Sequence, residues 1–333
     1  MTQAQQLADL SQAYTAGALG GFRNRLINGG PMVLSRPAAT LVPGAPIYGG
    51  PDRWRMVNST GVSTSFKQDA GTITAGGVAM PAVVQTVVTP VTDLSGTNTW
   101  QGINQVLEGY NVYDLKGAAI AFSTWFLTNV SGLYAIAVRD STPTVSYVTT
   151  FSAVAGTPVK VTFYAPGNSA LVIPASNAPG LYLCIGALNA GSLVAPSLNT
   201  WVAGSYTAAA GTVNWGAAAN NFISISEPQL EVGSICTPFE RRGITLEMLL
   251  CMRYRQQNYI VNYGTLTKAT DTYRTWTVQF MTSMRVAPAI LATLSSGSLS
   301  IVASGVNGFT GNINIGDTTT TVQMTGWSAE AEL

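Results

Sequence analysis

Hydrophobic and polar positions alternate with the period of a β-strand over most of the chain. The clearest case is 159–164, Val-Lys-Val-Thr-Phe-Tyr, in which every second side chain is apolar. A period of two places successive side chains on opposite faces of a sheet, so the pattern predicts a strand with one buried face. Strand patterns also occur at 82–88, 118–130, 134–138, 145–151, 180–187 and 222–230.

Turn residues separate these segments, for example at 130–132, 165–168 and 178–180. No segment with helical spacing lies between them, as a parallel α/β sheet would require. Strands at this spacing are typical of a sandwich or a jelly roll. We therefore predict a jelly-roll β-sandwich for 22–240. Its first part, 22–60, is rich in Pro and Gly and reads as loop, with a short strand at 31–34 and another opening at 52–56.

The pattern changes to helical spacing at 241–258, which predicts a junction helix N-capped by Thr245. At 100° per residue Leu246, Leu249 and Leu250 share one face, and Met252 lies on another side. A helix that is apolar on several sides is buried on several sides. These four residues are therefore the candidates for a subunit interface.

The ends of the chain form the remaining predicted parts. Residues 259–333 show five further strand patterns and are expected to form a smaller C-terminal β-sandwich, the tip domain, with strands at 274–280, 289–294, 299–303, 312–315 and 320–327. Residues 1–21 carry apolar positions at spacings of three and four, which predicts a short amphipathic helix. This N-terminal segment is a candidate attachment point for other proteins.

Composition removes several classes of function. Charged residues make up only 9% of the chain and the net charge is +1, against about a quarter charged in an average protein. No basic field is present to bind nucleic acid. No apolar run is long enough to span a membrane, and the start has no signal-peptide pattern. A surface of small neutral residues is poorly protected against association, which favours an oligomer over a monomer.

Histidine is absent, which removes histidine-based catalytic triads and most zinc ligand sets. The three cysteines, Cys184, Cys236 and Cys251, have no metal-binding spacing and are expected to be reduced core thiols. Neither a cofactor nor a metal is predicted.

The carboxylates provide the remaining candidate chemistry, because glycoside hydrolysis needs a pair of them in a cleft. Glu227, Glu231, Glu240 and Glu247 are close in sequence, but Arg241 and Arg242 lie among them. Ion pairing is therefore the expected use. We expect Glu231 and Glu240 to pair with the arginine group Arg23, Arg25, Arg53 and Arg55 and to clamp the ends of the jelly roll.

Sugar binding needs exposed aromatic side chains on loops. Trp201, Tyr206 and Trp215 lie in the Gly-, Ala- and Asn-rich run 196–221. Trp327 follows Gly326 out of register with its strand, whereas Trp276 alternates with Val278 and Phe280 and is expected in the core. The candidate ligand-binding residues are thus Trp201, Tyr206, Trp215 and Trp327. Packing in the core or between subunits is the alternative for each.

Several motifs together resemble a group of bacteriophage tail-fibre and virion-surface proteins with a jelly roll like that of carbohydrate-binding modules. They are Asn28-Gly29-Gly30, Pro51-Asp52-Arg53-Trp54, Gln229-Leu230-Glu231-Val232-Gly233, Thr237-Pro238-Phe239-Glu240, and Cys251 with Arg253 and Tyr254. The resemblance covers about 22–333 and departs from the group at Pro31 and Arg255. It implies a homotrimer located on the virion.

The sequence therefore predicts a non-enzymatic virion protein, a homotrimeric tail fibre or receptor-binding protein. Its partners would be other virion proteins, contacted through the N-terminal segment, and host polysaccharide or lipopolysaccharide. The first alternative is a head-fibre, capsid-decoration or tail adaptor protein with a purely structural role. The second is a polysaccharide depolymerase, although the short repeat of a β-helix is missing.

Overall fold

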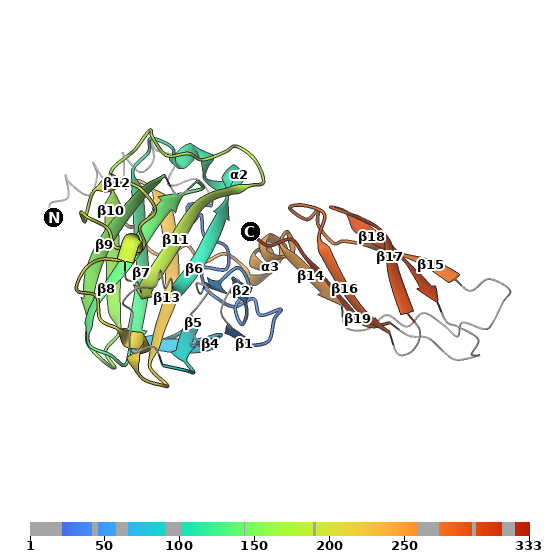
Figure 1. Ribbon diagram of the computed structural model, residues 1–333, viewed down its shortest axis with the longest axis horizontal. Coiled ribbons are helices and arrows are strands. Elements are labelled where there is room, and N and C mark those ends of the chain that lie inside the picture. The colour runs from blue at the N-terminus through green and yellow to red at the C-terminus, as the bar shows by residue number, and fades with distance from the viewer. Residues whose placement is uncertain are drawn as a thin grey trace. The chain divides into compact units, whose positions relative to one another are not determined.

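The computed structural model describes residues 22–41, 46–57, 66–90, 101–142, 144–188, 191–258, 273–294, 298–314 and 324–333. The chain divides into two compact units, residues 1–243 with Leu333 and residues 244–332. Antiparallel strands are the main regular secondary structure of both (Figure 1). The helix predicted at 1–21 lies outside the described residues.

The first unit contains two antiparallel sheets. The six-stranded sheet has the order β1-β4-β5-β13-β7-β10 and the seven-stranded sheet the order β12-β9-β8-β11-β6-β3-β2. The strands are β1 (Ala39–Leu41), β2 (Ile47–Tyr48), β3 (Arg55–Met56), β4 (Phe66–Ala75), β5 (Val78–Val87), β6 (Gln101–Glu108), β7 (Ile120–Thr128), β8 (Gly132–Asp140), β9 (Val145–Ala153), β10 (Val159–Ala165), β11 (Pro179–Leu188), β12 (Trp201–Ala203) and β13 (Phe222–Val232). Neighbours in space are mostly not neighbours in sequence, which confirms the predicted all-β jelly-roll sandwich.

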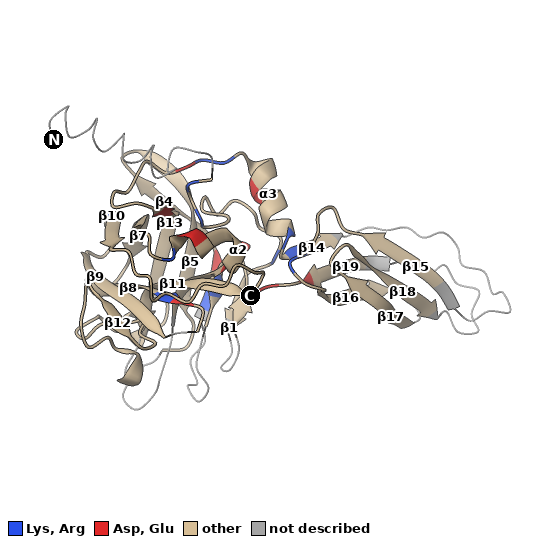
Figure 2. Cartoon of the chain, turned by 90° about the horizontal axis from the view of Figure 1, so that it is seen from above, with Lys and Arg blue, Asp and Glu red and all other residues tan. Residues whose placement is uncertain are grey.

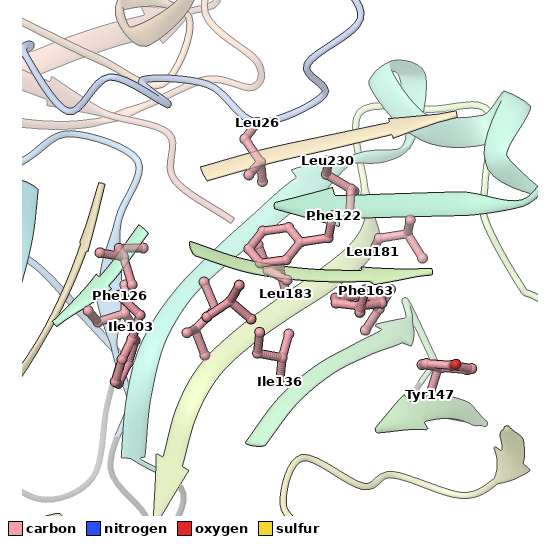
Figure 3. Close-up of a cluster of buried hydrophobic side chains, with 14 of the residues drawn as sticks. Leu26, Ile103, Phe122, Phe126, Ile136, Tyr147, Phe163, Leu181, Leu183 and Leu230 are labelled. Carbon is pink, nitrogen blue, oxygen red and sulfur yellow. The ribbon is translucent and has the colours of Figure 1, made fainter. Parts of the chain in front are cut away.

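The core lies between the two sheets. Phe122 and Phe163 point inward from the six-stranded sheet, and Ile136 and Leu183 from the seven-stranded sheet (Figure 3). In β10 burial alternates along the strand, with Val161, Phe163 and Ala165 buried. The alternation read from the sequence is thus the cause of the sandwich, since each strand buries one face against the other sheet.

The N-terminal segment 22–30 is held by β13 and by the segment 233–242, here called the return segment. The backbone N–H of Arg25 donates to the carbonyl oxygen of Leu230 (2.7 Å). Arg242 of the return segment donates to the carbonyl oxygen of Leu26 (2.9 Å). The chain therefore closes the sandwich by joining its first and last segments.

Four short helical segments connect the strands of the first unit. They are α2 (Gly109–Val112), η1 (Tyr113–Leu115), η2 (Gly191–Leu193) and η3 (Trp215–Ala217). The loop 191–217 covers part of the outer face of the seven-stranded sheet, where small side chains such as Ala137 and Ala208 pack together.

The second unit begins with the nine-residue helix α3 (Ile244–Met252). Two three-stranded sheets follow, of order β14-β19-β16 and β15-β18-β17. Their strands are β14 (Arg255–Asn258), β15 (Tyr273–Gln279), β16 (Ala289–Leu294), β17 (Ser298–Gly305), β18 (Gly308–Asn314) and β19 (Met324–Glu330). Phe309 fills the centre, within 6.1 Å of the rings of Trp276, Phe280 and Trp327.

Three local predictions were wrong. The junction helix expected at 241–258 ends at Met252, and its last four residues form β14 instead. The helix α3 begins at Ile244, so Thr245 lies inside it and is not its N-cap. The short strand expected at 31–34 does not form. There the carbonyl oxygen of Val33 accepts hydrogen bonds from the backbone of Asp52 (2.9 Å) and from the side chain of Asn28 (3.0 Å). These individual hydrogen bonds replace the regular series of backbone pairs that a strand would make.

Candidate functional site

Trp215, one of the four aromatic residues predicted to bind sugar, has no exposed surface. Its ring lies in the core of the first unit and its indole N–H donates to the carbonyl oxygen of Gly186 (2.8 Å). The prediction for Trp215 was wrong because η3 turns this side chain into the sandwich instead of leaving it in the loop.

The other three predicted residues are partly buried. Trp201 on β12 packs edge-on against Tyr147 (5.4 Å between ring centroids), and its indole N–H donates to Pro166 (2.6 Å). Tyr206 packs on the small side chains of the outer sheet face. Trp327 packs against Phe280 in the second unit. Each keeps some access to solvent, and their role in sugar binding stays a prediction.

Two tyrosines that the sequence reasoning missed are the most exposed aromatic residues of the described chain. Tyr110 in α2 is 56% exposed and Tyr113 in η1 is 54% exposed. They are three residues apart in the sequence, one in α2 and the other at the start of η1, which follows α2 directly. We call Tyr110 and Tyr113 the tyrosine pair.

The turn that carries the tyrosine pair is anchored on its other face. Val112 and Leu115, again three residues apart, are fully buried in the core. The backbone N–H of Gly109 donates to Ala178 (2.8 Å), and the N–H of Tyr110 donates to Ser176 (2.8 Å). The two rings are therefore presented by a fixed backbone, and little ordering entropy remains to be lost on binding.

Glycine at position 109 is required for this anchoring. A Cβ atom there would lie 2.0 Å from the carbonyl oxygen of Pro174 and 2.9 Å from that of Ser176. The loop that precedes β11 can pack against the turn only because this side chain is missing.

Polar and charged groups lie near the tyrosine pair in the sequence and in the fold. Arg25 forms a partly exposed ion pair with Asp114 (2.6 Å) and also donates to the carbonyl oxygen of Asn111 (3.4 Å). Aromatic faces combined with nearby hydrogen-bonding groups are the usual lining of a site for a small polar ligand. The sequence holds one signal for this turn. Between two glycines, segment 109–117 carries two tyrosines three residues apart and two aliphatic residues three residues apart.

A third tyrosine, Tyr182 on β11, lies on the outer face of the seven-stranded sheet. The guanidinium carbons of Arg139 and Arg55 lie 4.7 Å and 5.5 Å from the centre of its ring. Burial lowers the pKa of Arg139, although nearby Cys184 and Tyr182 act in the opposite direction. Because cations already contact this ring, it is a poorer stacking surface than the tyrosine pair.

Several acidic side chains of the first unit serve in structural contacts. The carboxylate of Glu231 accepts from the backbone N–H (2.8 Å) and the hydroxyl (2.6 Å) of Thr237. Asp140 accepts from the hydroxyl of Thr144 (2.6 Å), and Glu227 pairs with Arg241.

The predicted ion-pair partners of Glu231 and Glu240 were wrong. Glu240 accepts from the backbone N–H groups of Phe22 and Asn24 and pairs with Arg242. The clamp therefore exists but acts through backbone hydrogen bonds, which residue identities along the sequence do not reveal.

Charged residues are sparse among the residues that the structure describes (Figure 2). Within the described ranges no cluster of His, Cys, Asp and Glu could hold a metal ion. None of the helices in those ranges is long and apolar enough to cross a membrane.

The predicted subunit-interface residues lie on α3. Leu249 is exposed, and Leu246, Leu250 and Met252 are partly buried. Exposed apolar side chains on a helix are compatible with an interface, and this assignment stays a prediction.

Comparison with known proteins gives only distant similarities. No protein-family model matches the chain, and no curated protein matches it. Among solved structures, the chain is similar to a carbohydrate-binding module, CBM4 (13% identity, 62% of this chain, 98% of that chain, TM-score 0.32). It is also similar to the tandem CBM22-1–CBM22-2 domain of Paenibacillus barcinonensis Xyn10C (10% identity, 90% and 93% covered, TM-score 0.29).

A third similar structure is the tripod from the baseplate of bacteriophage Tuc2009 (12% identity, 72% of this chain, 79% of that chain, TM-score 0.26). Similarities this distant support no argument about function. The jelly-roll assignment rests on the strand order of the first unit.

Proposed function

We propose that the chain is a non-enzymatic structural protein of a bacteriophage virion, a homotrimeric tail fibre or receptor-binding protein that binds a host-surface glycan. The observation that carries the binding role is the tyrosine pair, exposed on a turn that the core and two backbone hydrogen bonds fix. A pyranose ring buries its apolar face on such side chains, and its hydroxyl groups can meet the polar rim.

The segment beside the rings offers polar groups for the hydroxyl groups of a sugar. They are the Arg25–Asp114 ion pair and the exposed Lys116, three residues after Tyr113. Of the two predicted ligands, a polysaccharide or a lipopolysaccharide, either would bind through its glycan.

The virion location rests on the resemblance of the motifs around Asn28-Gly29-Gly30 and Thr237-Pro238-Phe239-Glu240 to virion-surface proteins. These motifs have a structural use that explains them. Asn28 bonds the 31–34 and 52–54 segments, and the return segment holds the start of the sandwich through Glu240.

The absence of enzymatic activity is supported by the use of the carboxylates. Asp52, Asp140, Glu231 and Glu240 all accept hydrogen bonds that hold the fold. A hydrolase would need two of them facing a bound sugar.

A purely structural decoration or adaptor protein is the second candidate, favoured by the low content of charged residues in the chain. Purified chain is mixed with cells of the host, with its lipopolysaccharide and with its capsular polysaccharide. Retention on any of these supports the receptor-binding role, and failure on all of them favours the structural role. Release of reducing sugar during incubation would instead indicate a depolymerase. Gold-labelled antibody on intact particles tests the virion location and distinguishes tail from head.

A further inference from the structure

Two arginines flank one tyrosine on the outer face of the seven-stranded sheet. The guanidinium carbons of Arg55 on β3 and Arg139 on β8 lie 5.5 Å and 4.7 Å from the centre of the Tyr182 ring. Both arginines are more than nine-tenths buried, whereas Tyr182 keeps partial exposure. The carboxylate of Asp140, next to Arg139 in the sequence, accepts hydrogen bonds from Thr144. The fold thus holds two positive charges beside one ring.

Two buried polar atoms at this place point to a ligand. Arg55 and Asn104 lie directly opposite each other in the pairing of β3 with β6, so their side chains share the outer face of the sheet. Asn104 is fully buried and donates to the sulfur of Cys184 (3.4 Å). Nε of Arg55 is a donor and Oδ1 of Asn104 is an acceptor, and neither has a hydrogen-bond partner among the residues that the structure describes. Because such atoms are costly to leave unpaired, each needs an explanation.

An oxygen atom of the chain itself shows what Arg55 accepts at this place. Leu333 belongs to the first unit. Its main-chain oxygen accepts from Nη1 of Arg55 (2.9 Å) and from the hydroxyl of Tyr48 (2.7 Å). Tyr48 lies opposite Arg55 in the pairing of β2 with β3, on the same face. A guanidinium and a phenol that converge on one oxygen are donors suited to a carboxylate. The Leu333 oxygen therefore stands in for a carboxylate oxygen.

We propose that Arg55, Tyr48 and Asn104 form a binding site for an acidic sugar, a ring that carries one carboxylate beside hydroxyl groups. The carboxylate takes the place of the Leu333 oxygen at Arg55 and Tyr48. Nε of Arg55 donates to a second oxygen of the ligand, and one ligand hydroxyl donates to Oδ1 of Asn104. A ligand with only a carboxylate would leave that acceptor unpaired, so the hydroxyl group is part of the requirement. This site goes beyond the proposed function, because it does not include the tyrosine pair.

The test titrates the full chain with glucuronate by isothermal calorimetry, and glucose is the neutral twin with a hydroxymethyl group in place of the carboxylate. Arg55→Gln removes the charge, and Tyr48→Phe removes only a hydroxyl group. Lys67→Gln is the matched control, since it removes one positive charge from an exposed pair with Asp69. Wild type and control are expected to bind glucuronate equally, and at least about tenfold more tightly than glucose. The affinity should fall at least about tenfold in Arg55→Gln and about two- to tenfold in Tyr48→Phe.

Three results would overturn the proposal: no binding of glucuronate by the wild type, equal binding of glucose, or a Tyr48→Phe variant that binds like the wild type. Tyr48→Phe keeps the test decisive if Arg55→Gln fails to fold. The variant Tyr110→Ala/Tyr113→Ala should bind glucuronate like the wild type, and a loss of binding there would place the ligand at the tyrosine pair and overturn this site. Glucuronate binding by a chain that binds no host glycan would refute the proposed receptor role and leave this site standing.

Discussion

Replacing Glu240 by Gln is expected to loosen the joint between the return segment and the N-terminal segment. One oxygen, Oε1, accepts from the backbone N–H groups of Phe22 (3.0 Å) and Arg23 (3.3 Å). The other, Oε2, accepts from the N–H of Asn24 (2.9 Å) and from Nε of Arg242 (3.4 Å). Each of the two carboxylate oxygens of Glu240 thus accepts two hydrogen bonds, which link the return segment to the N-terminal segment.

A glutamine keeps only one of these two oxygens. The amide nitrogen that replaces the other oxygen is itself a donor and would face N–H donors. At least one charge-assisted hydrogen bond is therefore lost. Such a bond contributes about 1.5–3 kcal/mol. Because the side chain keeps some exposure, we expect a loss of about 2 kcal/mol. In a unit of this size that lowers the melting temperature by about 4–8 °C.

The effect should depend on pH. Burial raises the pKa of the Glu240 carboxyl, but hydrogen bonds from Asn24, Arg23 and Phe22 and the charge of Arg242 together lower it below its ordinary value of 4.5. A carboxyl whose pKa is lowered by folding stabilises the folded state above its ordinary pKa. That contribution is lost as the pH falls through the lowered value. The stability difference between wild type and variant should therefore be full at neutral pH and shrink below pH 4.5.

Scanning calorimetry measures the melting temperature, and amide exchange of residues 22–26 reports on the joint itself. Asp69→Asn is the matched control, since it also removes one negative charge but from an exposed pair with Lys67 (2.8 Å). The control should change stability by less than about 0.5 kcal/mol. The reasoning is refuted if Glu240→Gln melts like the wild type at neutral pH, or if exchange at 22–26 is unchanged.

Two further predictions concern the first unit. Gly109→Ala should lower the stability of this unit by about 1–3 kcal/mol and weaken glycan binding, because the added Cβ would lie 2.0 Å from the carbonyl oxygen of Pro174. The control Gly243→Ala, with open space around the added Cβ, should melt like the wild type. Equal melting temperatures of the two variants would contradict the anchoring argument. Burial and the charge of Glu231 raise the pKa of the Cys236 thiol from 9.0 to about 11. At pH 8 its thiolate should be about 100-fold scarcer than that of a free cysteine, and mass spectrometry after iodoacetamide treatment should find it unmodified; alkylation at the rate of a free thiol would show the reasoning to be wrong.

The strands were predictable wherever alternation was regular. β10 and β15 were found almost residue for residue, because each has one buried and one solvated face. The strands β4 and β6 were missed. In β6, Gln101–Glu108, buried polar residues such as Asn104 and Gln105 interrupt the apolar pattern. Their burial depends on partners distant in sequence, for example Ile27, whose backbone bonds Gln105.

The candidate site was harder to predict than the fold. The sequence favoured tryptophans in a Gly-rich run, but whether a ring points into the sandwich is decided by the turn that carries it, as η3 shows for Trp215. Tyr110 and Tyr113 were overlooked because a four-residue helix between two strands has too few positions to show a period. Trp54, a residue of the motif at 51–54, is a core residue: its ring is fully buried and its indole N–H donates to the carbonyl oxygen of Asn28 (3.0 Å).

The most direct test of the central claim, non-enzymatic glycan binding through the tyrosine pair, is a binding titration on an array of bacterial capsular polysaccharides and lipopolysaccharides. Full-length wild type is compared with Tyr110→Ala/Tyr113→Ala and with Tyr164→Ala, a control that removes an exposed tyrosine from β10. We predict that wild type and control bind at least one glycan without cleaving it. The double variant should bind that glycan at least about tenfold more weakly. Equal binding by the double variant, or no binding by the wild type to any glycan, would contradict the account.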